Sequence, residues 1–273
     1  MQPAVSVIIP TYKPGVYINI CLSSLARQTL SKELYEILVV LNGCADPWLS
    51  QLNQSINELK KQYGINCTIL HSDSASVSNA RNIGLDSAKG DYICFIDDDD
   101  YVSSSFLEQL LEKSDHETIA LSRPYAFLDG NDDKEIASYR IKNDWNKFHN
   151  RGITPFYIPK RFFDGPCMKL IHKDIIADRR FDPRFRNGED SIFMFLISDK
   201  IKYAAFCNDE AIYYRRFRDG SAQSLLKDWK KRPVVVWNKF RMYTKYYLSS
   251  PFKYSLRFYF SRLIGTIGTL LNG

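Results

Sequence analysis

Residues 90–100 read Gly-Asp-Tyr-Ile-Cys-Phe-Ile-Asp-Asp-Asp-Asp. A short apolar run bounded by glycine and charged residues is typical of a buried strand in a parallel sheet. The four consecutive carboxylates repel one another and cannot all be buried without partners. They directly follow the predicted strand, at the carboxyl end where open α/β sheets bind ligands. This stretch therefore predicts an α/β fold and the edge of the sheet that carries its site.

Strand and helix patterns alternate along the first hundred residues, up to the aspartate run. Apolar runs predict strands over 5–10, 35–41, 67–71 and 91–97, and helical spacing predicts helices over 16–28, 47–63 and 76–90. A repeated strand-helix order predicts a mostly parallel sheet flanked by helices, with right-handed crossovers.

The second half of the chain is less regular. The pattern predicts helices over 103–114 and 190–200, strands over 118–127, 202–207 and 211–216, and a mobile loop or lid over 129–151. After Leu225 the sequence becomes basic, aromatic and helix-like. We therefore expect a C-terminal helical extension on the α/β domain.

The composition excludes several classes of protein. The chain has 273 residues, of which 45% are apolar and 25% charged, so it is not a disordered tail, a collagen-like fibre or a coiled coil. The net charge is +6, but residues 227–273 hold ten basic residues and one acid, or +9, which leaves −3 for residues 1–226. A slightly acidic body argues against nucleic acid as a partner.

The chain carries the features of a cytoplasmic protein. The first residues lack the basic region of a signal peptide, and no apolar run approaches the ~18 residues of a membrane-spanning helix. The six cysteines form no C-x-x-C pair, so we expect free thiols in a reducing compartment.

The aspartate run is a candidate metal site. Hard divalent cations take oxygen ligands, and Mg²⁺ or Mn²⁺ suits phosphate-bearing substrates. Spacing of two along an extended chain would put Asp97 and Asp99 on the same side. The alternative is that Asp99 or Asp100 caps a helix that begins near Ser103.

Four stretches together carry a resemblance to a known family. They are Val5-Ser6-Val7-Ile8-Ile9-Pro10-Thr11-Tyr12, Ser76-Val77-Ser78-Asn79-Ala80-Arg81-Asn82-Ile83-Gly84, residues 90–100, and Phe181-Asp182 with Gly188-Glu189-Asp190. In this order and spacing, the chain resembles inverting glycosyltransferases of family two with the GT-A (Rossmann-like) fold, of the bacterial polysaccharide type. The resemblance is strong over residues 4–105 and looser to about residue 224.

The resemblance implies roles for individual residues. Asp99, with Asp97, is expected to hold Mn²⁺ or Mg²⁺, and Asp190 to act as general base, with Glu189 as runner-up. The expected nucleotide-sugar-binding residues are Pro10, Thr11, Tyr12, Asn42, Arg81, Asp97, Asp98, Arg216, Arg218 and Ser221. The expected domains are a GT-A catalytic domain over 1–224, with a nucleotide-binding half (1–100) and an acceptor-binding half (101–224), and the extension over 225–273.

Two positions depart from the family pattern. Asn42 stands where an acid is usual; its amide can still pair with a base edge but supplies no charge. Arg218 stands where a His is frequent; it cannot ligate a cation, but it can bind phosphate through two hydrogen bonds. Arg216, Arg218 and Ser221 are thus candidates for a lid over the diphosphate, or form a solvated basic turn.

The expected reaction is direct displacement at the anomeric carbon. A sugar passes from a nucleotide-diphospho-sugar, by family frequency a UDP-sugar, to a hydroxyl of a glycan or lipid-linked acceptor, and a carboxylate takes the hydroxyl proton. The first alternative is a sugar nucleotidyltransferase, although the loop Thr11-Tyr12-Lys13-Pro14-Gly15 holds one glycine rather than the expected several. The second is a non-catalytic module for a nucleotide or divalent metal, which leaves Glu189-Asp190 unexplained.

The basic extension gives a further expectation. Aromatic and basic residues interleave over 227–273, which suits the surface of an anionic membrane where a lipid-linked acceptor lies. We expect a peripheral contact with the inner face of the cytoplasmic membrane. A helical extension packed on the body, or a homodimer contact, explains the same composition.

Overall fold

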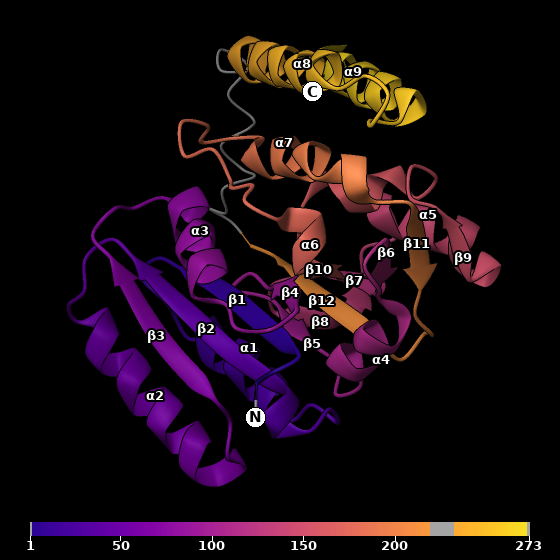
Figure 1. Cartoon of the computed structure of the whole chain (residues 1–273). Helices are drawn as coiled ribbons and strands as arrows, with labels where there is room; N and C mark the ends of the chain where they lie inside the picture. Colours follow the sequence, from indigo (N-terminus) through magenta and orange to yellow (C-terminus); the bar gives the residue numbers. More distant parts are fainter. Residues whose placement is uncertain (1, 219–231, 272–273) are drawn as a thin grey trace.

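The four apolar runs of the first hundred residues pair as parallel strands in the computed structural model, which describes residues 2–218 and 232–271 (Figure 1). In spatial order they are β3 (Cys67–Ser72), β2 (Tyr35–Asn42), β1 (Val5–Thr11) and β4 (Tyr92–Phe95). Every residue of β1 and β2 is buried, as expected of strands covered on both faces. The predicted strands and their direction are confirmed.

The same sheet continues beyond β4 with mixed direction. β10 (Lys169–His172) runs antiparallel to both β4 and β6 (Thr118–Leu121), and β11 (Tyr203–Phe206) and β9 (Ile153–Pro155) complete eight strands. β10 has no counterpart among the strands predicted from the sequence. The sheet is nevertheless mainly parallel, in agreement with the predicted α/β class.

A second sheet of four strands lies beside the first. Its order is β5 (Tyr101–Val102), β12 (Ile212–Phe217), β7 (Arg123–Leu128) and β8 (Asn131–Glu135). The prediction of one strand over 118–127 is therefore wrong, since β6 and β7 belong to different sheets. The chain passes between them at the buried Ser122, whose backbone N–H and hydroxyl both donate to the Met168 carbonyl.

Helices and short 3₁₀ turns connect and cover these strands. The helices are α1 (Tyr17–Ala26), α2 (Trp48–Tyr63), α3 (Val77–Ser87), α4 (Phe106–Lys113), α5 (Arg140–Phe148), α6 (Lys173–Ile176), α7 (Glu189–Leu196), α8 (Arg232–Ser249) and α9 (Leu256–Leu271). The 3₁₀ turns are η1 (Lys32–Leu34), η2 (His149–Arg151), η3 (Lys160–Asp164) and η4 (Ser198–Lys200). Ser76 caps α3 as its sequence position indicates, because its Oγ accepts the Asn79 N–H at 3.3 Å.

The segment over 129–151 is ordered structure, so the prediction of a mobile loop or lid is wrong. It forms β8, α5 and η2, and α5 turns Trp145 into the core with 2% of its surface exposed. Ile141, Trp145 and Phe148 stand at helical spacing, which is the signal that the surrounding polar residues obscured.

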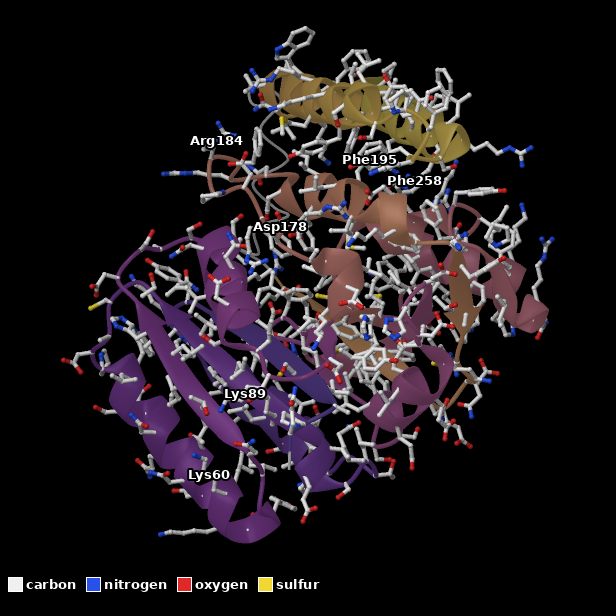
Figure 2. The ribbon with its side chains drawn as sticks, viewed as in Figure 1. Lys60, Lys89, Asp178, Arg184, Phe195 and Phe258 are labelled. Carbon is white, nitrogen blue, oxygen red and sulfur yellow. The ribbon has the colours of Figure 1, made fainter. Side chains whose placement is uncertain are left out.

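The C-terminal helices pack on the body of the molecule. α8 and α9 lie against α7 at the top of the view in Figure 1. The ring of Phe195 from α7 packs against the ring of Phe258 from α9, with 5.8 Å between the ring centroids (Figure 2). Arg262 of α9 pairs with Asp164 and donates to the Lys160 carbonyl at 2.6 Å. The extension is therefore helical, as predicted, and its inner face is part of the core.

Most of the cysteines fill core positions, as the sequence indicates. Cys21, Cys67, Cys94 and Cys207 are buried, and burial raises the pKa of the Cys94 thiol to about 12. A thiol with so high a pKa remains protonated and behaves as a small apolar residue. Cys44 alone among the six is exposed.

Close packing of α3 on β1 depends on Gly84. A Cβ at this position would overlap the Cγ2 of Ile8 in the middle of β1. We expect Gly84→Ala to lower the free energy of unfolding by about 1–3 kcal/mol, because the methyl overpacks the core. Gly268→Ala in α9, where a Cβ meets open space, should leave stability equal or higher. Chemical denaturation measures both, and equal effects of the two substitutions would contradict this account.

Candidate active site

Arg81 of α3 lies at the centre of the site and is buried, with 3% of its surface exposed. Its guanidinium forms an ion pair with Asp190, at the start of α7, and a second with Asp97, after β4, at 3.1 Å. A buried cation needs such partners because an unpaired charge in the interior is strongly destabilising. Arg81 therefore joins three segments that are far apart in the sequence.

The aspartates after β4 form a turn. The Asp100 N–H donates to the Asp97 carbonyl at 3.1 Å, and β5 follows directly. The prediction that Asp97 and Asp99 share one side of an extended chain is wrong, since Asp97 faces Arg81 and Asp99 faces Arg218 at 2.8 Å. The helix-cap alternative is also excluded, because α4 begins only at Phe106.

Asp98 and Asp100 are carboxyls whose pKa is raised mainly by burial. Asp98 accepts the Thr11 hydroxyl at 2.5 Å, yet burial raises the pKa of Asp98 to about 7. Burial and the Asp97 charge raise the pKa of Asp100 well above its usual range, although its carboxylate accepts the Arg216 backbone N–H at 2.8 Å. A cation bound nearby would favour the charged form of both carboxyls.

Two arginines of the second sheet reach the aspartate turn. Arg216 is 7% exposed, donates to the Asp99 carbonyl at 3.1 Å and pairs with Asp129 at 2.7 Å. The Arg218 side chain, which pairs with the Asp99 carboxylate, is 41% exposed. Arg216 thus holds the turn from within, and Arg218 stays accessible to a ligand. Ser221, the third residue of the predicted lid, lies outside the described residues.

Asp190 is partly exposed to solvent, and its surroundings shift the pKa of its carboxyl. Its side chain is 30% exposed at the first turn of α7. Burial raises the pKa of Asp190, the Arg81 guanidinium opposes this, and the Asp97 charge adds to it. Asp97, which follows β4, is thus a like-charged neighbour that raises the pKa of Asp190.

Glu189 is more enclosed than Asp190. It is 9% exposed, and its Oε2 finds no hydrogen-bond partner within residues 2–218 and 232–271. Burial first, and then the Asp190 charge, raise the pKa of Glu189 to about 7. Gly188 precedes it with φ 84°, and Lys239 of α8 lies where a Gly188 side chain would stand. The C-terminal extension therefore contacts the start of the α7 helix.

Four of the predicted nucleotide-binding residues, Pro10, Thr11, Tyr12 and Asn42, lie at the carboxyl ends of β1 and β2. Asn42 is 5% exposed and donates to the Thr11 carbonyl at 2.7 Å, so its amide joins the two strand ends. Tyr12, next to Pro10-Thr11, is half exposed and packs over Gly43. Gly43 has φ 99°, and a Cβ there would lie 2.7 Å from the Tyr12 ring, so only glycine fits.

Lys169, a buried residue of β10, is not among the site residues predicted from the sequence. Lys169 of β10 is 1% exposed, and its ammonium donates to the Gly165 and Cys167 carbonyls at 2.6 Å. Burial lowers the pKa of Lys169 to about 8. Because the position of a Cβ on Gly165 lies 3.9 Å from the Asp190 Oδ2, Lys169 holds a loop that lies beside Asp190. A lysine inside the apolar run of residues 167–172 was the available signal.

The chain is similar to a known protein family and to individual proteins. The model of the family described as Glycosyl transferase family 2 matches residues 6–180. The minor teichoic acid biosynthesis protein GgaB of Bacillus subtilis is 28% identical over 243 residues, which are 86% of this chain and 26% of GgaB. The Staphylococcus aureus poly(ribitol-phosphate) β-N-acetylglucosaminyltransferase TarS is 25% identical over 237 residues, covering 80% of this chain and 36% of TarS. The chain thus spans about a quarter to a third of these relatives.

Solved structures share the fold. TarS residues 1–349 in complex with UDP-GlcNAc match with a TM-score of 0.65 at 19% identity, covering 99% of this chain and 81% of that one. The mannosyltransferase PcManGT of Pyrobaculum calidifontis, in complex with GDP-Man and Mn²⁺, matches with a TM-score of 0.62 at 12% identity, covering 99% and 75%. At these identities the likeness establishes the GT-A-like fold.

The enclosed Glu189 gives a prediction about pH. A carboxyl whose pKa is raised by folding favours the folded state at low pH, and this contribution is lost as pH rises through about 7. Glu189→Gln removes the titration, so its stability relative to wild type should increase between pH 5 and pH 8 by about 2 kcal/mol. Urea unfolding at both pH values measures this difference. A constant difference at the two pH values would show that Glu189 ionises normally.

Proposed function

The chain belongs to glycosyl transferase family 2, and from that premise we propose that it moves a hexose from a nucleotide-diphospho-sugar to an acceptor hydroxyl with inversion at the anomeric carbon. The observation that carries this proposal is the Arg81 bridge. It holds one carboxylate of the aspartate turn and the accessible Asp190 on the same guanidinium. A donor held at the turn then has a general base nearby, as a single displacement requires.

In this reaction Asp190 takes the proton of the acceptor hydroxyl. The hydroxyl is too weakly acidic to attack unaided, and its oxygen forms the new bond as the bond to the diphosphate breaks. Arg81 orients the Asp190 carboxylate and keeps it ionised, and burial together with Asp97 restores part of its basicity. Glu189 is enclosed and protonates more readily, so its role is to support the turn before α7.

The aspartate turn has the donor set for Mn²⁺ or Mg²⁺. Within residues 2–218 and 232–271 no three of its carboxylates converge tightly enough to enclose an ion. Such a cation is commonly bound by one or two carboxylates and by substrate phosphates. Asp99, with Asp97, would hold the ion, and the exposed Arg218 can leave Asp99 to contact the diphosphate. When bound, the ion neutralises charge on the leaving diphosphate.

The donor is placed by residues from the first half of the chain. We infer a UDP-sugar because TarS binds UDP-GlcNAc in a structure of the same fold. Tyr12, which is half exposed after β1, would stack its ring on the nucleotide base. Thr11 and Asn42 join the two strand ends that carry the Tyr12 loop. Residues 1–100 would thus form the nucleotide-binding half and residues 101–224 the acceptor-binding half of one catalytic domain.

For the acceptor we propose a glycan or lipid-linked polymer of the cell surface. GgaB is a minor teichoic acid biosynthesis protein, and TarS transfers N-acetylglucosamine to poly(ribitol-phosphate), as their names state. The family match disfavours a nucleotidyltransferase, and the accessible Asp190 disfavours a non-catalytic binding module.

Substitution of Asp190 tests the reaction. We expect Asp190→Asn to lower the rate of sugar transfer about 100-fold or more, because loss of a general base costs that much. Binding of UDP-glucose or UDP-GlcNAc, measured by calorimetry with Mn²⁺, should remain close to that of wild type. Asp182→Asn in the preceding loop, whose carboxylate pairs with the exposed Arg184, is the control that keeps activity. Near-normal transfer by Asp190→Asn would assign the base elsewhere, and loss only in Glu189→Gln would assign it to Glu189.

We also propose that the outer face of α8 and α9 contacts an anionic membrane. Nine of the sixteen exposed large apolar residues among those described lie on these helices or on the connection between them: Val234, Trp237, Phe240, Leu248, Phe252, Leu256, Phe260, Ile264 and Ile267. In Figure 2 ring-bearing side chains project from α8 and α9 away from α7. None of the described helices is long and apolar enough to cross a bilayer. The face therefore suits contact with a membrane surface rather than insertion across it.

Charge favours lipid over a second copy of the chain. Arg241, Lys245, Lys253 and Arg257 are exposed among the apolar residues of this face, and no acid follows Asp228. An isologous dimer would place this basic face against itself, and juxtaposed like charges are costly. An anionic membrane supplies the opposite charge and an apolar phase together.

Vesicle binding tests the outer face. We expect wild type to co-sediment with vesicles of phosphatidylcholine and phosphatidylglycerol, more weakly in high salt and with phosphatidylcholine alone. The triple variant Trp237→Ser, Phe252→Ser, Phe260→Ser should bind at least about tenfold more weakly, since each ring contributes buried apolar area. Ile153→Ser, which removes an exposed apolar residue from β9, is the matched control.

Light scattering distinguishes the dimer from the membrane contact. A wild-type dimer that the triple variant converts to a monomer, without vesicle binding by either protein, would assign this face to self-association instead.

A further inference from the structure

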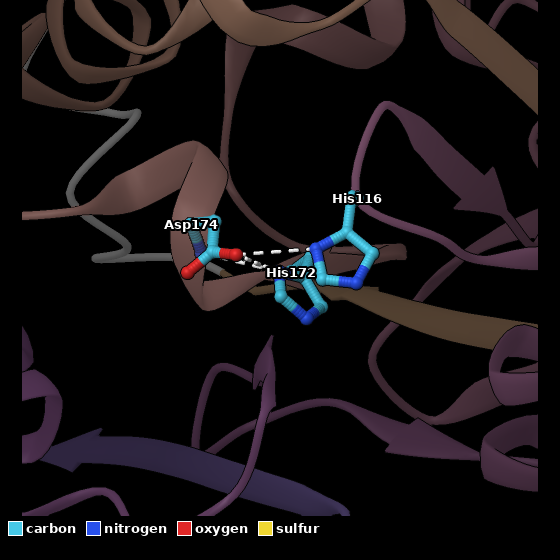
Figure 3. A group of neighbouring side chains, drawn as sticks. All are labelled: His116, His172 and Asp174. Carbon is cyan, nitrogen blue, oxygen red and sulfur yellow. Dashed lines mark hydrogen bonds and ion pairs between the residues drawn. The ribbon is translucent and has the colours of Figure 1, made fainter.

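Two histidines and an aspartate converge at the edge of the main sheet opposite the aspartate turn. His172 ends β10 and pairs with Tyr92, the first residue of β4, whereas the aspartates follow the last residue of β4. Asp174 stands in the first turn of α6, and His116 comes from the connection between α4 and β6 (Figure 3). The cluster is therefore separate from the donor site.

The ligand atoms lie at distances that suit a small tetrahedral ion. The Asp174 Oδ2 is 3.1 Å from the His116 Nδ1 and 3.6 Å from the His172 Nδ1, and one ligand atom of each residue lies within 4.8 Å of the others. Zinc bonds of 2.0–2.1 Å in a tetrahedron separate ligands by about 3.3 Å. Small side-chain adjustments would therefore close the three ligands around an ion.

The cluster is open to solvent, and the neighbouring lysines do not bind the Asp174 carboxylate. The side chains of His116 and Asp174 are 69% and 61% exposed, so an ion can enter from solvent. His172 is buried against the edge of the Tyr92 ring, which fixes its orientation. Lys173 pairs with Asp91, and Lys200 donates to the backbone carbonyl of Asp174 rather than to its carboxylate.

An ion would have to replace two existing interactions. The His172 Nδ1 accepts the backbone N–H of Asp174 at 3.2 Å, and a protonated His116 forms an ion pair with Asp174. The first is a single hydrogen bond, and the second is an exposed pair; each is worth about 1 kcal/mol. Both are weak against the binding energy of zinc held by protein ligands.

We propose that His116, His172 and Asp174 bind one Zn²⁺, with water as the fourth ligand. Imidazole ligands favour zinc over Mg²⁺ and Mn²⁺, so this site and the donor site select different ions. The bound ion would tie the α4–β6 connection and the start of α6 to the end of β10. Its expected effect is on stability, since the three residues lie away from Arg81 and Asp190.

Metal titration of the full chain tests the site. After dialysis against a chelator, and in the presence of excess Mg²⁺, we expect wild type to bind about one equivalent of Zn²⁺ and to raise its thermal midpoint. Co²⁺ should give the visible absorption bands of a tetrahedral complex. His116→Ala and Asp174→Asn, both at exposed positions, should each weaken Zn²⁺ binding by more than about tenfold.

Two controls assign the signal. Cys44→Ser removes the exposed thiol, and Asp99→Asn removes a carboxylate of the donor site; both should bind Zn²⁺ as wild type does. Absence of saturable binding by wild type would overturn the proposal. Undiminished binding by His116→Ala and Asp174→Asn, or loss of binding in Cys44→Ser, would do so equally.

Discussion

The site depends on one buried charge, the guanidinium of Arg81. In an interior of low dielectric constant this charge is tolerable only when carboxylates meet it, and Asp97 and Asp190 do so from two other segments. The pairing sets the distance between the aspartate turn and the start of α7. In the proposed reaction, a donor bound at the turn and an acceptor activated by Asp190 would therefore be placed by the same interaction that stabilises the packing of α3.

Two further buried cations, Arg216 and Lys169, hold the segments around the aspartate turn and Asp190. Arg216 holds the aspartate turn from the second sheet, and Lys169 holds the loop beside Asp190, both from buried positions. Burial, and after it the neighbouring aspartates, raise the pKa values of Asp98 and Asp100. In the proposed reaction a cation that arrives with a diphosphate would offset this effect, and Arg218, more exposed than the others, would be the side chain that responds to it.

The C-terminal helices connect the site to the outer surface of the molecule. Their inner face packs Phe258 against Phe195, and Lys239 lies over Gly188 at the entrance to α7. Their outer face is apolar and basic. The proposed membrane contact would orient α7 toward that surface, where the proposed lipid-linked acceptor would lie. The proposed zinc site acts elsewhere, at the opposite edge of the sheet.

The sequence by itself determined the features that local pattern controls. Apolar runs specify β1 to β4, a side-chain cap specifies the start of α3, and motif order specifies the family and the edge that carries the site. Only the tertiary structure decided which charges meet, because the Arg81 to Asp190 pair joins residues 109 positions apart and depends on shared burial. The same holds for β10 and α5. A strand inserted antiparallel between parallel neighbours, and a polar helix held by the buried face of Trp145, have no local signal strong enough to exclude a loop.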